Sequence, residues 1–427
     1  MPVYIYSVSF FQSILGKGNL SVRFPSVLAG TMTVVFLIKL IADLTKRRKP
    51  ALISGYILAI LPWHVHFGRA GFEANLSLFF ITAGTYFLFS FSQRKINLLL
   101  SFILLTLAFY TYFAARIFLP LLLISLFIKD KKKLKKIILF LILPFILFSL
   151  SSQGLVRPST VLFTREVKAN PDTFFTNKIF LFNEQFAKNY FKYFSLDFLF
   201  FSGDGNGRHG VKEVGGIYLW LLPFLLLGIH RGIKEKKFAD KIFFIWLLVT
   251  PIAGALSIPS PHTLRSLYMV VPIAYFSASG MSRLNLDKRL LSCSICFIVI
   301  YFLFQYLHIY YVHYPKRTSP DWSGGYRQAI EYAVEREDKY DKIFITDKMT
   351  LGYIYLYYYG REDPAEVLKS PAPQKGFEKF KFVSSPFNQK IEGKVLYLGP
   401  YWEDWYGKKL AEVKNQGNDL VFTIWEN

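Results

Sequence analysis

The sequence predicts a polytopic α-helical membrane protein of about ten spans, followed by a small C-terminal α/β domain. Of its 427 residues, 52% are hydrophobic and only 19% are charged. A soluble domain does not expose so much apolar surface, so this composition favours a multi-pass membrane protein. Two further observations predict the same architecture: apolar runs alternate with basic loops, and the composition changes after Val312.

The net charge of +22 is distributed unevenly along the chain. Residues 313–427 contain equal numbers of basic and acidic side chains, so all of the excess lies in the apolar part, residues 1–312. A nucleic-acid-binding protein instead concentrates its positive charge on a soluble face. The charge pattern therefore excludes a nucleic acid as the partner.

Apolar runs recur through residues 1–312, and each is a candidate span or part of one. The runs are Phe24–Leu44, Ala51–Phe67, Ala74–Ser92, Leu98–Phe113, Ile117–Ile128, Ile137–Leu150, Ile217–Ile229, Ile242–Ile258, Ser266–Met281 and Leu290–Val312. Several are shorter than the roughly 20 residues of a typical span, so their boundaries are soft. We place a sharp break near Ala114–Arg116, because one long helix over 98–128 would disturb the alternation of loops. Residues 3–15 are either an interfacial helix or the end of a further span.

Basic clusters occupy every second connection between these runs. They lie at 46–49, 94–95, 129–136, 231–241 and 283–289. Positively charged loops face the cytoplasm, so the alternate connections face outward. The turn around residue 70, the long segment 151–216, the turn 259–265 and everything after residue 312 are then extracytoplasmic, in a protein of the plasma membrane.

Residues 313–427 form the second predicted domain. Helix-like stretches at 325–338 and 351–359 alternate with strand-like stretches at 342–346, 394–398 and 420–424, as in a small α/β domain. The aromatic residues at 401, 402, 405 and 406 have two interpretations: they contact glycan from the surface of an outer domain, or they pack its core.

Polar residues gather in the outward turn Pro62–Asn75. Glu73 is the only carboxylate in the short outward turns, and Arg69 precedes it by four residues. An acid and an arginine at the rim of membrane helices are costly to place, so they usually mark a site. The alternative is a simple ion pair between residues four apart on a helix.

Three motifs connect this turn to a known family. They are Arg23–Gly30, Leu61–His64 and Gly68–Asn75, and the likeness extends through Phe201–His209 and Ser260–Leu267. In this order they resemble the membrane glycosyltransferases of the dolichyl-phosphate-mannose-protein mannosyltransferase and aminoarabinose transferase type, within the C-type glycosyltransferase superfamily. The resemblance covers most of residues 1–312. It implies transfer of a sugar from a polyprenyl-phosphate carrier to an acceptor at the outer face.

The chain departs from that family at its start. Members begin with a further span and an outer loop that carries the acidic catalytic base, whereas this chain begins near the end of that loop, at Pro2–Tyr6. We expect a truncated gene model; the alternative is a genuine short form without activity. The resemblance then makes Glu73 a second acid that supports Arg69. Glu73 becomes the leading candidate for the catalytic base if the chain truly starts at Met1.

The chemistry of transfer indicates which other residues belong to the site. The donor phosphate leaves as an anion and needs nearby cations, for which Arg69, His262, Arg265 and Arg116 are the candidates. A snorkelling side chain is the alternative for Arg116. The acceptor needs a base, for which Glu73 is the candidate. Asp204, Arg208 and His209 are expected in a loop near the acceptor, and His64 as a polar lining residue.

No metal site is predicted from spacing, although a divalent cofactor is left open. Asp204–Asn206 resembles the start of a calcium loop, but Gly215 stands where the bidentate glutamate is required. His64 and His66 do not share one helix face and alone make a poor metal site.

The resulting hypothesis is a hexosyl- or pentosyltransferase that uses a polyprenyl-phosphate sugar and a protein, lipid or glycan acceptor in the membrane. A transporter or flippase for lipid-linked sugars is the first alternative. It should show paired internal repeats with broken helices at the midplane, and no such repeat is visible. An inactive membrane scaffold is the second alternative.

Overall fold

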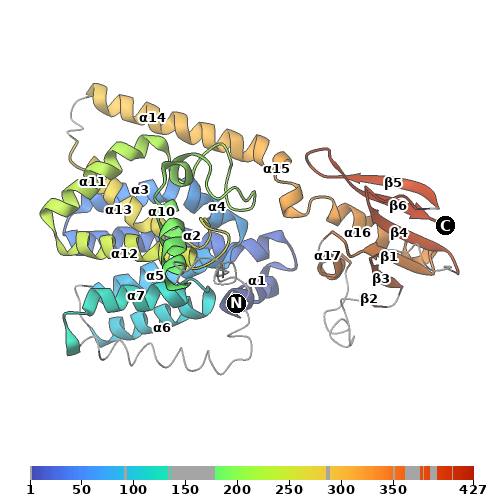
Figure 1. Ribbon diagram of the computed structural model, residues 1–427, viewed down its shortest axis with the longest axis horizontal. Coiled ribbons are helices and arrows are strands. Elements are labelled where there is room, and N and C mark those ends of the chain that lie inside the picture. Colours follow the sequence, from blue (N-terminus) through green and yellow to red (C-terminus); the bar gives the residue numbers. More distant parts are fainter. Residues whose placement is uncertain are drawn as a thin grey trace. The chain divides into compact units, whose positions relative to one another are not determined.

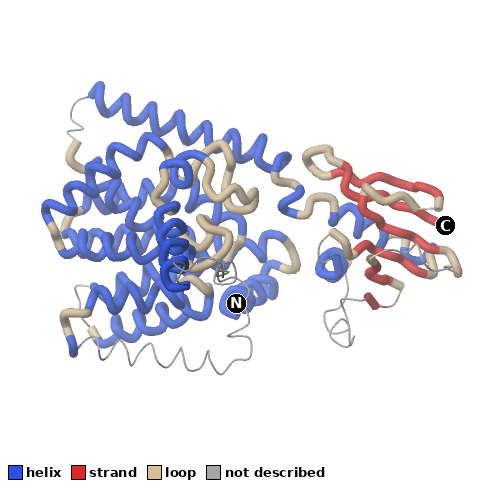
Figure 2. The backbone as a smooth tube through the Cα atoms, in the orientation of Figure 1, coloured by secondary structure: helices blue, strands red, loops and turns tan. Residues whose placement is uncertain are grey.

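The computed structural model describes residues 2–90, 94–132, 135, 178–284, 289–349, 352–360, 376–377, 379–384, 392–405 and 407–427. The chain divides into two compact units, Met1–Tyr306 and Leu307–Asn427. The described part of the first unit is helical, and the second unit contains all the described strands (Figures 1 and 2).

The helices of the first unit lie close to the predicted apolar stretches, except that residues 178–192, within the predicted long outward segment 151–216, also form a helix. They are α1 (Pro2–Leu15), α2 (Asn19–Thr45), α3 (Arg48–Ile60), α4 (Pro62–Ala70), α5 (Glu73–Phe89), α6 (Lys95–Thr111), α7 (Ala115–Phe127), α10 (Lys178–Lys192), α11 (Leu222–Glu235), α12 (Phe238–Ala255), α13 (Val270–Met281) and α14 (Arg289–His308). The predicted break before Arg116 is present, because α6 ends at Thr111 and α7 begins at Ala115. The predicted run Ile137–Leu150 lies outside the described residues.

The predicted run Ala51–Phe67 is two helices rather than one. Helices α3 and α4 are bent by 57° at Leu61. Pro62 follows Leu61, lacks a backbone N–H and disfavours helical dihedrals in the residue before it. Leu61 is accordingly extended, with φ −63° and ψ 124°. This bend turns α4 into a separate short helix whose end carries Arg69.

Three described helices are long and apolar enough to cross a membrane. They are Asn19–Thr45, Phe238–Ala255 and Cys293–Arg317, and the bent pair α3–α4 makes a fourth candidate. Shorter apolar helices are Lys95–Thr111, Ala115–Phe127 and Leu267–Met281. The span count of about ten therefore stays a prediction.

Close helix packing in the first unit depends on glycine. A Cβ atom on Gly228 of α11 would lie 1.8 Å from the carbonyl oxygen of Phe276 in α13, and one on Gly280 would lie 2.1 Å from that of Phe224. Neither distance is sterically possible, so these backbones touch only because both positions lack a side chain. Small residues allow membrane helices to pack in this way.

Two of the sequence motifs, Arg23–Gly30 and Gly68–Asn75, meet in one buried polar joint with α4. The Ser26 hydroxyl of α2 donates to the Phe67 carbonyl of α4 at 2.9 Å, and the Asn75 amide of α5 donates to the Ser26 carbonyl at 2.7 Å. A Cβ on Gly30 would lie only 3.3 Å from the same amide. These motif residues thus hold α2, α4 and α5 together beside the turn that carries Arg69 and Glu73.

The second unit contains a mixed six-stranded sheet in the order β2-β3-β1-β4-β6-β5. Its elements are α15 (Tyr314–Arg317), α16 (Tyr326–Val334), β1 (Lys342–Thr346), α17 (Gly352–Tyr359), β2 (Gly376–Phe377), β3 (Phe380–Val383), β4 (Val395–Pro400), β5 (Lys408–Lys414) and β6 (Leu420–Glu426). Strand β1 is parallel to both β3 and β4, and β6 is antiparallel to β4 and β5. The predicted helices and the strands β1, β4 and β6 are present, whereas β2, β3 and β5 were not predicted.

Both faces of the central strand β4 are buried. Leu396 and Leu398 pack with α16 and α17, while Tyr397 packs with Trp405 and Trp425. The interpretation that these aromatic residues pack the core is therefore confirmed for one of them; contact with glycan stays a prediction, and residue 406 lies outside the described residues. Trp405 belongs to the core, whereas Tyr401 and Trp402 are 52% and 56% exposed.

Candidate active site

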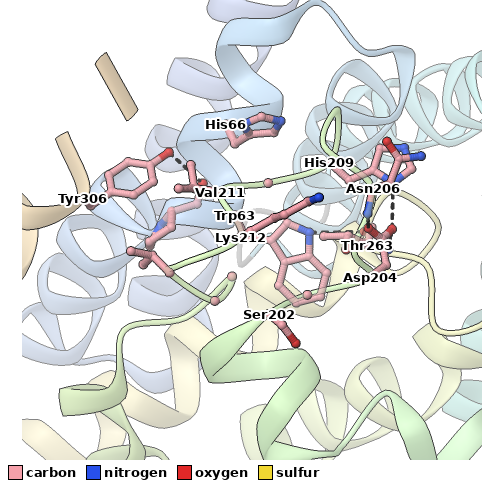
Figure 3. A pocket seen from close by; sticks show the side chains of 16 residues that line it. Trp63, His66, Ser202, Asp204, Asn206, His209, Val211, Lys212, Thr263 and Tyr306 are labelled. Atoms are coloured by element: carbon pink, nitrogen blue, oxygen red, sulfur yellow. Dashed lines mark hydrogen bonds and ion pairs between the residues drawn. The ribbon is translucent and has the colours of Figure 1, made fainter. Parts of the chain in front are cut away.

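Two loops and the start of α4 enclose a pocket in the first unit (Figure 3). One loop follows the π-helical turn Asp197–Phe201, and the other connects α12 to the 3-10 turn Leu267–Met269. Trp63 of α4 joins them, because its backbone N–H donates to Gly216 at 3.0 Å and its indole N–H to Thr263 at 3.2 Å. Tyr306 of α14 also lines the pocket, so its polar side chains come from four separate parts of the sequence.

The Asp204 carboxylate lies at the centre of the polar cluster. Its Oδ2 accepts hydrogen bonds from His209 Nδ1 at 2.7 Å and from the Thr263 backbone N–H at 2.8 Å. Its Oδ1 accepts one from the Asn206 N–H at 3.0 Å. Burial alone would raise the pKa of Asp204, but the hydrogen bonds from His209 and from the two amides hold this pKa below its ordinary value. Asp204 is thus an ionised carboxylate that ties the two loops together.

His262 approaches the same carboxylate from the second loop. Its Nδ1 lies 3.9 Å from Asp204 Oδ2, and its ring centroid lies 4.6 Å from that of His209. Burial and the nearby charge of Arg265 lower the pKa of His262 to about 3, so its imidazole is neutral at neutral pH. Asp204, His209 and His262 each offer one ligand atom, and these atoms lie within 4.8 Å of one another. The three residues are a candidate metal-binding set that loop spacing had not predicted.

Histidine 66, rather than His64, lines the pocket. His66 Nε2 is 2.8 Å from the Arg208 carbonyl, a hydrogen bond that holds the loop against α4. His64 is buried on another side of α4, where its Cε1 would contact a Cβ on Gly30 at 3.7 Å. Their alternate spacing on the helix explains why the two rings diverge.

An exposed lysine that was not predicted, Lys212, also lines the pocket. Lys212 reaches across the indole of Trp63 towards the side of His209 and Asn206 in Figure 3. It lies three residues after His209 in the same glycine-rich loop, and that position is the one sequence signal that could have indicated it.

Arg265 stabilises the loop that carries His262. Its Nη1 donates to Ser257 Oγ at 2.8 Å, to the Ile258 carbonyl at 3.1 Å and to the Pro259 carbonyl at 3.2 Å. One nitrogen of this predicted phosphate ligand is therefore engaged by its own loop.

Arg116 is held at the start of α7. Its Nε donates to the Phe109 carbonyl at 3.2 Å, and its guanidinium lies 5.7 Å from the ring centroids of Phe109 and Phe113. These contacts agree with the interpretation of an arginine supported by apolar surroundings.

The turn with Arg69 and Glu73 adjoins the pocket through an aromatic side chain. Arg69 is exposed in the last turn of α4, and Glu73 is the first residue of α5. Phe72 packs between them and the pocket, with its ring centroid 6.2 Å from that of His209. The two groups of predicted site residues therefore share one end of the helical unit.

Glu73 also lies beside α1. Burial and the charge of Glu73 raise the pKa of Tyr4, and Arg23 opposes this effect. The Tyr4 hydroxyl donates to the Val22 carbonyl at 2.9 Å, and it would lie 3.2 Å from a Cβ on Gly71, whose φ is +82°. Glycine at position 71 thus permits both the left-handed turn and the close approach of α1.

Comparisons with known proteins concern the family and the fold. Residues 1–153 match the family model described as dolichyl-phosphate-mannose-protein mannosyltransferase. No curated protein sequence matches the chain. Two crystal structures of ArnT from Cupriavidus metallidurans, one apo and one bound to undecaprenyl phosphate, align with TM-score 0.57 and 10% identity; each alignment covers 100% of this chain and 87% of theirs.

The oligosaccharyltransferase of Archaeoglobus fulgidus aligns with TM-score 0.48 and 15% identity over 90% of this chain and 52% of its own. At these identities the ArnT alignment shows the fold, that of a polytopic helical membrane protein with a C-terminal sheet domain. The match of residues 1–153 confirms the resemblance of this part of the chain to the dolichyl-phosphate-mannose-protein mannosyltransferases, and the ArnT alignment shows a shared fold.

Proposed function

We propose that the protein transfers a hexose or pentose from a polyprenyl-phosphate carrier to an acceptor at the outer face of the plasma membrane. The family match and the fold of ArnT, whose structure is bound to undecaprenyl phosphate, support this class of donor. The observation that carries the proposal is the pocket in which Lys212 and His66 surround the Asp204 cluster, next to the turn of Arg69 and Glu73. The basic loops on the opposite connections support an extracytoplasmic position for this pocket and for residues 313–427.

The transfer needs a cation and a base at opposite sides of the sugar. The bond between C1 and the phosphate oxygen breaks, and the polyprenyl phosphate leaves with the electron pair. The acceptor atom bonds to C1 and gives its proton to a base. Lys212, which lines the pocket, supplies positive charge for the leaving phosphate, and the exposed Arg69 and Arg208 are further candidates for this role.

Glu73 is the base that we assign within this chain, because Asp204 already accepts three hydrogen bonds and orients His209 instead. Glu73 is the first residue of α5 and directly follows Phe72, whose ring centroid lies 6.2 Å from that of His209, and this position supports the assignment.

A transporter remains the competing class, and the break between α3 and α4 is the feature that favours it. Transporters of that kind place broken helices in corresponding positions of two repeats. Within the described residues, one bent pair meets this description. We therefore prefer the transferase.

The decisive experiment incubates the purified full-length protein with a panel of polyprenyl-phosphate hexoses and pentoses and measures release of polyprenyl phosphate. We expect turnover with at least one donor, and Lys212→Ala should reduce it at least tenfold because a charge in the pocket is lost. Lys234→Ala, an exposed lysine at the end of α11, is the matched control and should leave turnover unchanged. If the protein instead moved the lipid-linked sugar from one leaflet of a vesicle membrane to the other without releasing polyprenyl phosphate, it would be a transporter.

A further inference from the structure

We propose that Asp204, His209 and His262 bind a divalent transition-metal ion of the zinc type. Binding of the ion stands on the geometry of these residues alone. Its role, to hold an oxygen of the donor phosphate, rests on the proposed function.

The distances fit an ion after small movements. A tetrahedral zinc ion with bonds of about 2.0–2.2 Å separates its ligand atoms by about 3.3–3.6 Å. Asp204 Oδ2 now lies 2.7 Å from His209 Nδ1 and 3.9 Å from His262 Nδ1, so the two distances fall on either side of that range. All three ligand atoms lie within 4.8 Å of one another, so modest side-chain movements would bring them to one ion. The side chains of Asp204, His209 and His262 are 4%, 7% and 12% exposed, so the position is largely shielded from bulk water.

The imidazole of His262 points to a missing partner. Its Nδ1 is buried and makes no hydrogen bond within the described part of the chain. A buried polar atom without a partner costs free energy, and native structures rarely leave one so. A metal ion beside Asp204 would satisfy this nitrogen.

Backbone contacts hold the candidate ligands in place. The His262 N–H donates to the hydroxyl of Tyr193 at 3.0 Å, and Tyr193 is fully buried. The Thr263 N–H donates to Asp204 at 2.8 Å. Metal sites typically orient their ligands through such outer contacts.

The ligand types decide which ion fits. Two imidazoles and one carboxylate favour zinc or a similar transition metal, whereas magnesium and calcium prefer oxygen ligands. Three protein ligands leave one coordination position open, as in catalytic rather than structural zinc sites. Asp204 and His209 also line the pocket into which Lys212 extends, so an anionic oxygen has access to that position. The ion and Lys212 would together neutralise the phosphate as it leaves.

Metal binding is tested directly on the full-length protein, purified through a tag without histidines and treated with a chelator. Zn²⁺ and Mn²⁺ are added in calorimetric titrations, and the bound metal is counted by mass spectrometry. We expect one Zn²⁺ per chain, with affinity reduced at least 100-fold in His262→Gln. His262 is the decisive position because Asp204 also anchors the loop. His230→Ala, an exposed histidine outside the pocket, is the matched control and should bind as the wild type does.

Two results overturn the metal proposal: no stoichiometric zinc in the wild type, or equal zinc binding in His262→Gln and wild type. Substitution with Co²⁺ gives a second readout, because the visible spectrum of tetrahedral Co²⁺ should appear in the wild type and be lost in the variant. Zinc binding without transfer from any donor leaves the site standing and removes the proposed function. Transfer that persists in metal-free protein removes the proposed role of the ion in transfer and leaves the proposed function standing, while the binding site is judged by the titrations alone.

Discussion

Asp204 and Glu235 are two carboxylates of the helical unit with lowered pKa values, but their surroundings differ in burial and in the kind of group that lowers the pKa. Asp204 is 4% exposed and bonded to one histidine and two backbone amides. Glu235 is 26% exposed at the end of α11, and the hydrogen bond from Lys237, with those from Arg231, lowers its pKa to about 2. It pairs with Arg231 at 3.0 Å, Lys237 at 2.5 Å and Arg283 at 2.9 Å.

The difference separates a site from a structural contact. Exposed ion pairs contribute little each, and several different residues can form them equally well. Arg231 also donates to the Ser279 carbonyl, so the Glu235 cluster connects α11 to the end of α13. The Asp204 cluster instead depends on buried groups with fixed directions and a histidine nitrogen without a partner in the described residues. Such an arrangement is costly unless a ligand uses it.

The largest effect is expected from Asp204→Asn. The change removes the charge that faces two imidazoles and turns one acceptor oxygen into a donor group. We expect transfer to fall at least 100-fold and the free energy of unfolding to drop by about 2–4 kcal/mol. Turnover assays and thermal unfolding in detergent measure the two effects. Asp197 is an exposed acid in the preceding turn, so Asp197→Asn should change neither the rate of transfer nor the free energy of unfolding. Equal losses in both variants would show that Asp204 has no special role.

An intermediate loss of transfer is expected from the first of two matched arginine substitutions. Arg265→Lys removes the planar group that donates to Ser257 and two carbonyls beside His262. We expect about a tenfold loss of transfer and weaker zinc binding. Arg283→Lys makes the same change at Glu235, where an ammonium can replace the guanidinium, and should leave both unchanged. Equal effects of the two changes would remove the difference between the regions.

The smallest effect is expected from Glu235→Gln. Three partly exposed pairs together contribute about 1 kcal/mol to the free energy of unfolding. Because the folded pKa is lowered to about 2, this stability is present above the unfolded value of about 4.3 and is lost as pH falls towards 2. The wild type should therefore exceed the variant in unfolding temperature at pH 6 and approach it near pH 3. A constant difference across that range would show that charge is not the cause.

The helices were predictable because apolar runs and basic loops are local signals. Leu61 and the edge strand β5 show where such signals are insufficient. The break at Leu61 follows from Pro62, but the surrounding apolar residues continue through it and conceal it. Strand β5 has the sequence KKLAEVK and a mostly exposed face, so its alternation is too weak to indicate a strand before its pairing with β6 is known.

Some of the site residues could likewise be predicted from the sequence, whereas their grouping could not. Asp204, His209 and His262 were each singled out from the sequence, and Arg69 and Glu73 from their unusual polarity in an outward turn. Their grouping was not visible, because His262 lies far along the chain from Asp204 and approaches it through a different loop. Lys212 and His66 also became candidates only through the pocket that they line.

By itself, the sequence determined the membrane class, the helices and the family resemblance, since hydropathy, loop charge and local motifs are all encoded in contiguous residues. Only the tertiary structure decided that two histidines share one buried carboxylate while three cations surround the partly exposed Glu235. The physical reason is that burial and ligand geometry depend on which loops meet in space, and a linear pattern does not specify that meeting.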